Sequence, residues 1–186
     1  MNQKLIQKKQ PLGNELQLQL LISSEEIEKR LERVARDLEK RYENEEVTIV
    51  MIMKGSFVLI ADLIRLLHLP SRLEYVQVSS YGERGIVKGT QEITGLDRID
   101  VSGRHVLIID DIFDTGETLA EIAEKIKAKG VSSLSSLVLL SKKVRRSTDY
   151  HPDITLFEIE DRFVVGYGLD YKEYYRGLPD IYAIER

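Results

Sequence analysis

The stretch Val106–Thr118, VLIIDDIFDTGET, decides the fold that this sequence predicts. Four apolar residues lead directly into Asp110 and Asp111, and Asp114 follows three positions later, before a small polar turn. A continuous apolar run is typical of a strand that is buried on both faces of a parallel sheet. After the turn, apolar residues recur at helical spacing from Leu119 to Ile126, so the segment predicts a strand, a turn and a helix in succession.

Strands and helices alternate through the rest of the central chain. A capping box at Ser23 and Glu26 predicts the start of a helix, and the apolar run Val47–Met53 predicts a second buried strand. A further helix is expected from about Phe57 to His68. Other strands are predicted over residues 72–81, 134–141, 154–159, 163–168 and 180–185. This alternation predicts an α/β fold with a central, mostly parallel sheet flanked by helices.

Residues 82–103 differ from the segments on either side of them. They contain five glycines among charged residues and few bulky apolar groups. We expect a mobile excursion, part of which pairs as a ribbon. A long loop inside a compact domain is more often a functional lid than a simple connection.

Length, charge and composition exclude several classes of protein. The chain has 186 residues, which predicts one domain, and its net charge of -4 gives no reason to expect nucleic acid as a partner. The absence of cysteine excludes disulfides and thiol catalysis and fits a reducing compartment. No apolar run approaches the roughly 20 residues that span a bilayer, and the first residues lack the apolar core of a secretory signal. We therefore expect a cytoplasmic protein without a membrane partner.

The acids at the strand end suit a ligand that is both hydroxylated and anionic. In an open parallel sheet, ligands bind beyond the carboxyl ends of the strands, where Asp110 and Asp111 are expected. The turn at Thr115 and Gly116 and the following helix N-terminus suit a phosphate. The alternative is that Asp114 is a simple helix N-cap and the two adjacent acids are solvated. Adjacent like charges repel by roughly 1 kcal/mol or more near a surface, which favours the ligand site.

Five motifs together resemble a known family. They are MKGS (Met53–Ser56), SSYG (Ser79–Gly82), the stretch VLIIDDIFDTGET, SKK (Ser141–Lys143) and FVVGYGLDY (Phe163–Tyr171). Over about residues 15–185 the chain resembles type I phosphoribosyltransferases, within them the hypoxanthine–guanine group. The resemblance implies that family's fold in a single domain, 1–186. It also implies a small hood from about residues 1–22 and 155–186, and a mobile active-site loop at about 82–103.

The resemblance also implies an activity. Members of this group transfer 5-phosphoribose from 5-phosphoribosyl 1-diphosphate to hypoxanthine or guanine and release pyrophosphate, with Mg²⁺ as cofactor. The expected partners are these small molecules and further copies of the chain, as a homodimer or homotetramer. A xanthine-preferring enzyme remains an alternative. A regulatory nucleic-acid-binding protein on the same fold is disfavoured because Asp114, Lys142 and Asp170 are all present and the net charge is negative.

Residue roles follow from the same resemblance. Asp110 and Asp111 would hold the ribose hydroxyls with Mg²⁺ nearby, Asp114 would take the purine's proton, and Asp170 would be a metal-associated acid beside the base. The 5′-phosphate loop would consist of Thr115, Gly116, Glu117 and Thr118. The pyrophosphate would contact Lys54, Gly55 and Arg176, and in relatives the Lys54–Gly55 peptide can be cis.

Base recognition would fall to three residues after the central strands. Lys142 would donate to the exocyclic oxygen of a 6-oxopurine, Phe163 would stack on the ring, and Val164 would contact its edge through the backbone. Taken alone, Lys142 would be interpreted as a solvated surface group and Phe163 as part of the core. Ser80 and Tyr81 would head the loop that closes over the site.

Overall fold

The structure is a computed structural model that describes residues 5–9, 15–43, 45–80 and 91–185. Its larger sheet has six strands. In spatial order they are β5 (Gln91–Thr94), β4 (Ser71–Ser80), β3 (Val47–Met53), β6 (His105–Phe113), β7 (Ser133–Lys142) and β8 (Ile154–Ile159). Neighbouring strands from β4 to β8 are parallel, and β5 is antiparallel to β4. The mostly parallel sheet that the sequence predicted is confirmed.

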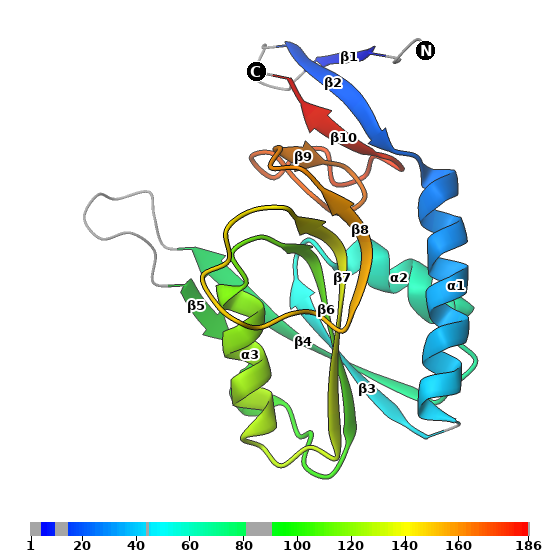
Figure 1. The fold of residues 1–186 in the computed structure, drawn as a ribbon, viewed down its shortest axis with the longest axis vertical. Coiled ribbons are helices and arrows are strands. Elements are labelled where there is room, and N and C mark those ends of the chain that lie inside the picture. The colour runs from blue at the N-terminus through cyan, green and yellow to red at the C-terminus, as the bar shows by residue number, and fades with distance from the viewer. Residues whose placement is uncertain (1–4, 10–14, 44, 81–90, 186) are drawn as a thin grey trace.

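Helices cover both faces of this sheet (Figure 1). Helices α1 (Ser24–Tyr42) and α2 (Phe57–Leu66) pack on one face, and α3 (Glu117–Lys127) packs on the other. Side chains along β6 alternate between the two: Leu107 and Ile109 join the cluster with α1 and α2, whereas Val106 and Ile108 join the cluster with α3. All four are fully buried, which explains why this strand is a continuous apolar run.

The N-terminus of α1 has the predicted capping box. The Ser23 hydroxyl accepts a hydrogen bond from the Glu26 amide at 3.3 Å, and the Glu26 carboxylate accepts one from the Ser23 amide at 2.9 Å. Two otherwise free donors are thereby satisfied. Helix α2 ends at Leu66, slightly before the expected His68. None of the described helices is both long and apolar enough to cross a membrane.

A second, four-stranded sheet lies at the carboxyl end of the first (Figure 1). Its spatial order is β1 (Leu5–Lys9), β2 (Glu15–Ile22), β10 (Ile181–Ile184) and β9 (Val164–Val165). The described N- and C-terminal segments thus form the small hood that the family resemblance implied, although no strand or helix was predicted for residues 1–22. Its C-terminal part begins at Val164, because Ile154–Ile159 pairs with β7 in the larger sheet.

The segment expected to be a mobile excursion is partly built into the fold. Residues 82–90 lie outside the described residues. Beyond them, β5 pairs with β4 as the expected ribbon, and the 3₁₀ helix η1 (Leu96–Arg98) follows. Leu96, Ile99 and Val101 are buried in the cluster with α3. The expectation of a mobile loop that reaches residue 103 is therefore wrong for residues 96–101, because three spaced apolar side chains anchor a stretch that is otherwise charged.

Candidate active site

A cleft of about 750 Å³ opens at the carboxyl ends of β3 and β6. Three segments that are far apart in sequence line it: the turn after β3, the end of β6 with the turn into α3, and the loop after β9. The predicted residues that it brings together are Lys54, Gly55, Asp110, Asp111, Asp114, Thr115, Gly116, Glu117, Thr118, Asp170 and Arg176. The topology therefore brings together the residues that the family resemblance assigns to the phosphate, the ribose and the pyrophosphate.

Asp110 and Asp111 are held in this cleft by local backbone hydrogen bonds. Asp110, which is 7% exposed, accepts from the Asp111 amide at 2.9 Å, and Asp111 accepts from the Ile112 amide at 3.0 Å. Burial raises the pKa of the Asp110 carboxyl well above its ordinary value, and the charge of Asp111 raises it further. Burial also raises the pKa of Asp111. The interpretation of both acids as solvated turn residues is wrong, because Asp110 is buried.

Glycines bring the three segments into contact through their backbones. A Cβ on Gly55 would lie 1.6 Å from Asp111 Oδ2, and a Cβ on Gly168, whose φ is +98°, would lie 2.1 Å from the Gly55 carbonyl oxygen. Only glycine fits at either position. The one cis peptide bond in the described chain joins Met53 to Lys54. The cis bond therefore precedes Lys54, whereas the family resemblance pointed to the next bond, between Lys54 and Gly55.

The turn into α3 presents an uncapped helix N-terminus to the cleft. Gly116 is the N-cap, with φ +90°, and no side chain caps the helix. The alternative interpretation of Asp114 as the N-cap is therefore wrong. The backbone amides of the first turn and the positive end of the helix dipole border the cleft, an arrangement that suits an anion such as a phosphate.

Lys142, the last residue of β7, reaches the carboxylate of Asp114. Its Nζ lies 3.2 Å from Asp114 Oδ2 and 3.3 Å from Asp161 Oδ1. The Lys142 side chain is only 13% exposed, whereas that of Asp114 is 49% exposed. The interpretation of Lys142 as a solvated surface group is wrong, since its stem is buried and its ammonium is held between two acids.

A second hollow of about 620 Å³ lies beside this ion pair. Lys142, Asp161 and Phe163 are among the residues that line it. Phe163 is 41% exposed and contacts Tyr171 edge to face, with ring centroids 5.6 Å apart. The interpretation of Phe163 as a core residue is wrong, because its ring borders an open hollow. Val164 is buried and begins β9, the edge strand of the four-stranded sheet.

Arg176 and Lys54, the two expected pyrophosphate ligands, are joined by an acid that the sequence did not single out. Arg176 lies 2.7 Å from Asp170 Oδ1 and 3.4 Å from Glu173 Oε2, and Lys54 Nζ lies 3.0 Å from the same Glu173 oxygen. The Glu173 amide also donates to Asp170 at 2.8 Å. Both cations are therefore already gathered around carboxylate oxygens.

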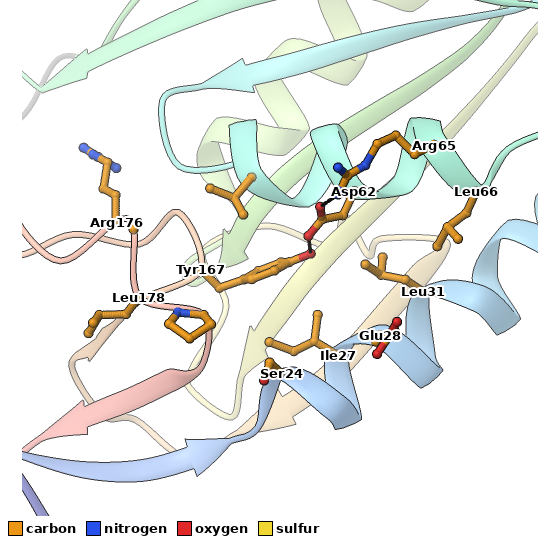
Figure 2. A pocket seen from close by; sticks show the side chains of 13 residues that line it. Ser24, Ile27, Glu28, Leu31, Asp62, Arg65, Leu66, Tyr167, Arg176 and Leu178 are labelled. Carbon is orange, nitrogen blue, oxygen red and sulfur yellow. Dashed lines mark hydrogen bonds and ion pairs between the residues drawn. The ribbon is translucent and has the colours of Figure 1, made fainter.

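Helix α2 holds the loop that carries Arg176 through a hydrogen bond to Tyr167. Tyr167, at φ +50°, donates from its hydroxyl to Asp62 at 2.7 Å, and Asp62 also pairs with Arg65. Figure 2 shows this contact beside a pocket of about 380 Å³ between α1, α2 and the loop, with the Arg176 side chain extending away from Tyr167. Tyr167 thereby anchors the loop while Arg176 remains available to the cleft.

The three acids expected near a metal do not form a closed protein cage. The part of the chain that the structure describes contains no group of three or more His, Cys, Asp or Glu residues placed to hold a metal ion. Asp170 is instead paired with Arg176. Asp110 and Asp111 offer carboxylate oxygens without an ion-pair partner among the described residues. This donor set fits Mg²⁺, which is usually held by one or two carboxylates together with substrate phosphates and water.

Two predicted residues are not placed by the structure. Ser80 ends β4, but its side chain is not described, and Tyr81 lies outside the described residues. Their assignment to a closing loop stays a prediction. Conversely, residues 146–148 contact the turn into α3, although the sequence assigned them no role.

Comparison with known proteins identifies relatives over most of the chain. The model of the phosphoribosyl transferase domain family matches residues 21–172. A hypoxanthine-guanine phosphoribosyltransferase of Aquifex aeolicus is 41% identical over 169 residues, covering 90% of this chain and 95% of that protein. One of Bacillus subtilis is 37% identical over 162 residues, covering 87% and 90%.

Solved structures agree with this relationship. The crystal structure of a hypoxanthine-guanine phosphoribosyltransferase from Bacillus anthracis superimposes with a TM-score of 0.78 at 33% identity, covering 90% of this chain and 96% of that one. A hypoxanthine phosphoribosyl transferase from Trypanosoma cruzi gives a TM-score of 0.80 at 34% identity, covering 89% and 90%.

The raised pKa of Asp110 predicts a pH-dependent effect of Asp110→Asn on stability. Below the ordinary pKa of an aspartate, near 4, the carboxyl is protonated in both the folded and the unfolded protein. Its favourable contribution to the free energy of unfolding is then fully present. That contribution is lost as pH rises through the raised pKa of the folded state. Asparagine keeps the acceptor and never ionises, so the stability of the wild type relative to Asp110→Asn should fall from pH 4 to pH 7.

Urea unfolding of both proteins at several pH values measures this difference. Asp149→Asn, which removes an exposed carboxylate, is the control and should show much less change with pH. A difference between wild type and Asp110→Asn that stays constant over this range would contradict the prediction.

Proposed function

The chain belongs to the phosphoribosyl transferase domain family, and on that premise we propose that it is a purine-salvage enzyme. It transfers 5-phosphoribose from 5-phosphoribosyl 1-diphosphate to hypoxanthine or guanine, with Mg²⁺ as cofactor, and forms inosine or guanosine monophosphate and pyrophosphate. The fold is the type I phosphoribosyltransferase fold. The observation that carries the substrate assignment is the buried Lys142, held beside Asp114 at the edge of the cleft.

The wider organisation is part of the same proposal. Residues 1–186 form one domain, because Ile22, Val164 and Ile181 of the hood pack in the same core cluster as α1 and α2. The cysteine-free sequence suits the cytoplasm. By resemblance to its family, the chain forms a homodimer or homotetramer, and Ser80 and Tyr81 take part in loop closure.

The sugar is held at the end of β6. The carboxylates of Asp110 and Asp111 accept hydrogen bonds from the two ribose hydroxyls, which relieves the burial of charge that raises their pKa values. When the bond from C1 to the diphosphate loosens, positive charge develops on the ribose. Fixed carboxylates in a site of low dielectric constant stabilise that charge more strongly than water does.

The leaving diphosphate pairs with two cations that are paired with acids in this structure. The diphosphate oxygens replace Glu173 and Asp170 as partners of Lys54 and Arg176, and the planar guanidinium suits two of these oxygens at once. The carboxylates of Asp110, Asp111 and Asp170 would hold Mg²⁺, which when bound would supply further charge neutralisation for the diphosphate. The electron pair of the broken bond leaves with pyrophosphate. The amides of Thr115 to Thr118 hold the 5′-phosphate.

The purine lies in the hollow beside Lys142. The Lys142 ammonium donates to the exocyclic oxygen, whereas adenine has an amine at that position, which is itself a donor and cannot accept this hydrogen bond. The exposed Phe163 ring stacks on the base, and Val164 contacts its edge through the backbone of an edge strand. As a ring nitrogen bonds to C1 of the ribose, the carboxylate of Asp114 takes the proton that the purine loses.

A purine panel tests the function. With Mg²⁺ and 5-phosphoribosyl 1-diphosphate, pyrophosphate release is expected with hypoxanthine and guanine, and little or none with adenine. Chelation of Mg²⁺ should abolish it. Xanthine belongs in the same panel, since it also has a 6-oxo group, and a preference for it would favour the xanthine enzyme. Equal turnover of adenine and hypoxanthine would refute the 6-oxopurine assignment.

Asp114→Asn tests the proton acceptor. The substitution keeps the shape of the side chain and removes its charge, so turnover should fall by about 10²-fold or more, the scale of a general base. The affinity for 5-phosphoribosyl 1-diphosphate should change less. Asp161→Asn is the matched comparison, because it removes the other carboxylate that contacts Lys142. If both variants lose turnover equally, the special role of Asp114 is disproved.

Lys142→Met tests base recognition. Methionine keeps most of the stem and removes the donor, so the KM for hypoxanthine should rise by about 10- to 100-fold, the scale of one charged hydrogen bond. The KM for 5-phosphoribosyl 1-diphosphate should change less. The neighbouring Lys143→Met removes an exposed lysine paired with Glu160 and should behave like wild type. Unchanged hypoxanthine kinetics in Lys142→Met would rule out the proposed contact.

A further inference from the structure

Arg146, in the segment after β7, joins the ends of two neighbouring strands. Its Nη1 donates to the carbonyl oxygen of Phe113 at 3.2 Å and also to that of Asp114, and its Nη2 donates to the Ser141 hydroxyl at 2.9 Å. The guanidinium also lies over the Phe113 ring, 4.4 Å from its centroid. Ser141 precedes Lys142, so one side chain connects the backbone of Asp114 to the strand that carries its lysine partner.

The next two residues continue this contact along the turn. The Ser147 amide donates to the Thr115 carbonyl oxygen at 2.9 Å. Thr148 Oγ1 lies 3.2 Å from the point where a Cβ of Gly116 would stand. Segment 146–147 therefore contacts three successive residues, Phe113 to Thr115, and Thr148 occupies the space beside Gly116.

The geometry of the peptide bond relates these contacts to the direction in which the amides of the turn point. In a planar trans peptide, the carbonyl and the following N–H point in opposite directions. The carbonyls of residues 113, 114 and 115 are all directed at segment 146–147. The amides of Asp114, Thr115 and Gly116 must therefore point away from this segment. These residues line the cleft, so segment 146–147 orients their amides for an anion.

We propose that Arg146, with the Ser147 amide, is a positioning residue that holds the 5′-phosphate loop in its binding conformation. In this proposal neither group contacts the substrate. Arg146 acts through the carbonyls of Phe113 and Asp114, and the Ser147 amide acts through that of Thr115. This inference rests on the proposed function, which places a 5′-phosphate at the turn. Arginine suits the task because its planar fork reaches two carbonyls and a hydroxyl at once, whereas a lysine ammonium has no such fork.

The affinity ratio between inosine and inosine 5′-monophosphate measures the phosphate contribution directly. Both dissociation constants are determined by calorimetry for wild type, Arg146→Met and Arg146→Lys. Methionine keeps apolar bulk near Phe113 but removes the donors, so the ratio should fall by about tenfold or more, the scale of hydrogen bonds from a charged group. Lysine should restore little of it. The KM for 5-phosphoribosyl 1-diphosphate should rise more than the KM for hypoxanthine.

Arg145→Met is the matched control, because Arg145 is exposed and should leave the ratio at the wild-type value. A wild type that does not prefer the monophosphate would refute the proposed function rather than this inference. If the wild type does prefer it, an unchanged ratio in Arg146→Met overturns the inference. Should Arg146→Met fail to fold, Ser141→Ala and Arg146→Lys decide: a reduced ratio supports the inference, and a wild-type ratio in both overturns it.

Discussion

The burial of Asp110 beside a second, half-buried carboxyl, that of Asp111, at the end of β6 is the constraint on which the rest of the site depends. Asp110 follows four fully buried residues, and both its burial and the neighbouring Asp111 raise its pKa. Such a group is unfavourable for a fold unless hydrogen-bond donors or cations reach it. In the free protein it accepts a backbone amide, and the cleft leaves its remaining oxygen positions to a ligand. The unfavourable burial of this carboxyl therefore lies where hydroxyl donors, or a positive charge that develops on a bound sugar, would gain most.

Close backbone packing brings the other groups to this carboxyl pair. Gly55 lies against Asp111, and Gly168 lies against Gly55, so the turn after β3 and the loop after β9 stack on the end of β6. The Tyr167 hydroxyl fixes the same loop to α2 through Asp62. Close approaches at two glycines thus bring together segments more than 100 residues apart: Gly168 meets the Gly55 backbone, and Gly55 meets the Asp111 carboxylate.

The cations in the site are paired with acids of the same chain, and a substrate can replace these acids as their partners. Arg176 and Lys54 meet around Glu173, and Lys142 is held beside Asp114. Each of these pairs keeps a cation in place without burying it alone. An anionic diphosphate can replace the acids around the first two cations, and a purine oxygen can approach the third. The same ion pairs therefore keep in place the cations that the proposed reaction would use.

The sequence by itself determined the elements whose signals are local. The apolar run of β6, the capping box at Ser23 and the helical spacing of α3 depend on neighbouring residues, and the motifs around Asp110 and Lys142 indicated both family and site. Tertiary structure alone decided four features: the partial burial of Lys142, the ion pairs of Glu173, the burial of Leu96, Ile99 and Val101, and the contact of Arg146 with the turn into α3. These features join residues distant along the chain, so no local pattern of hydrophobicity or charge specifies them.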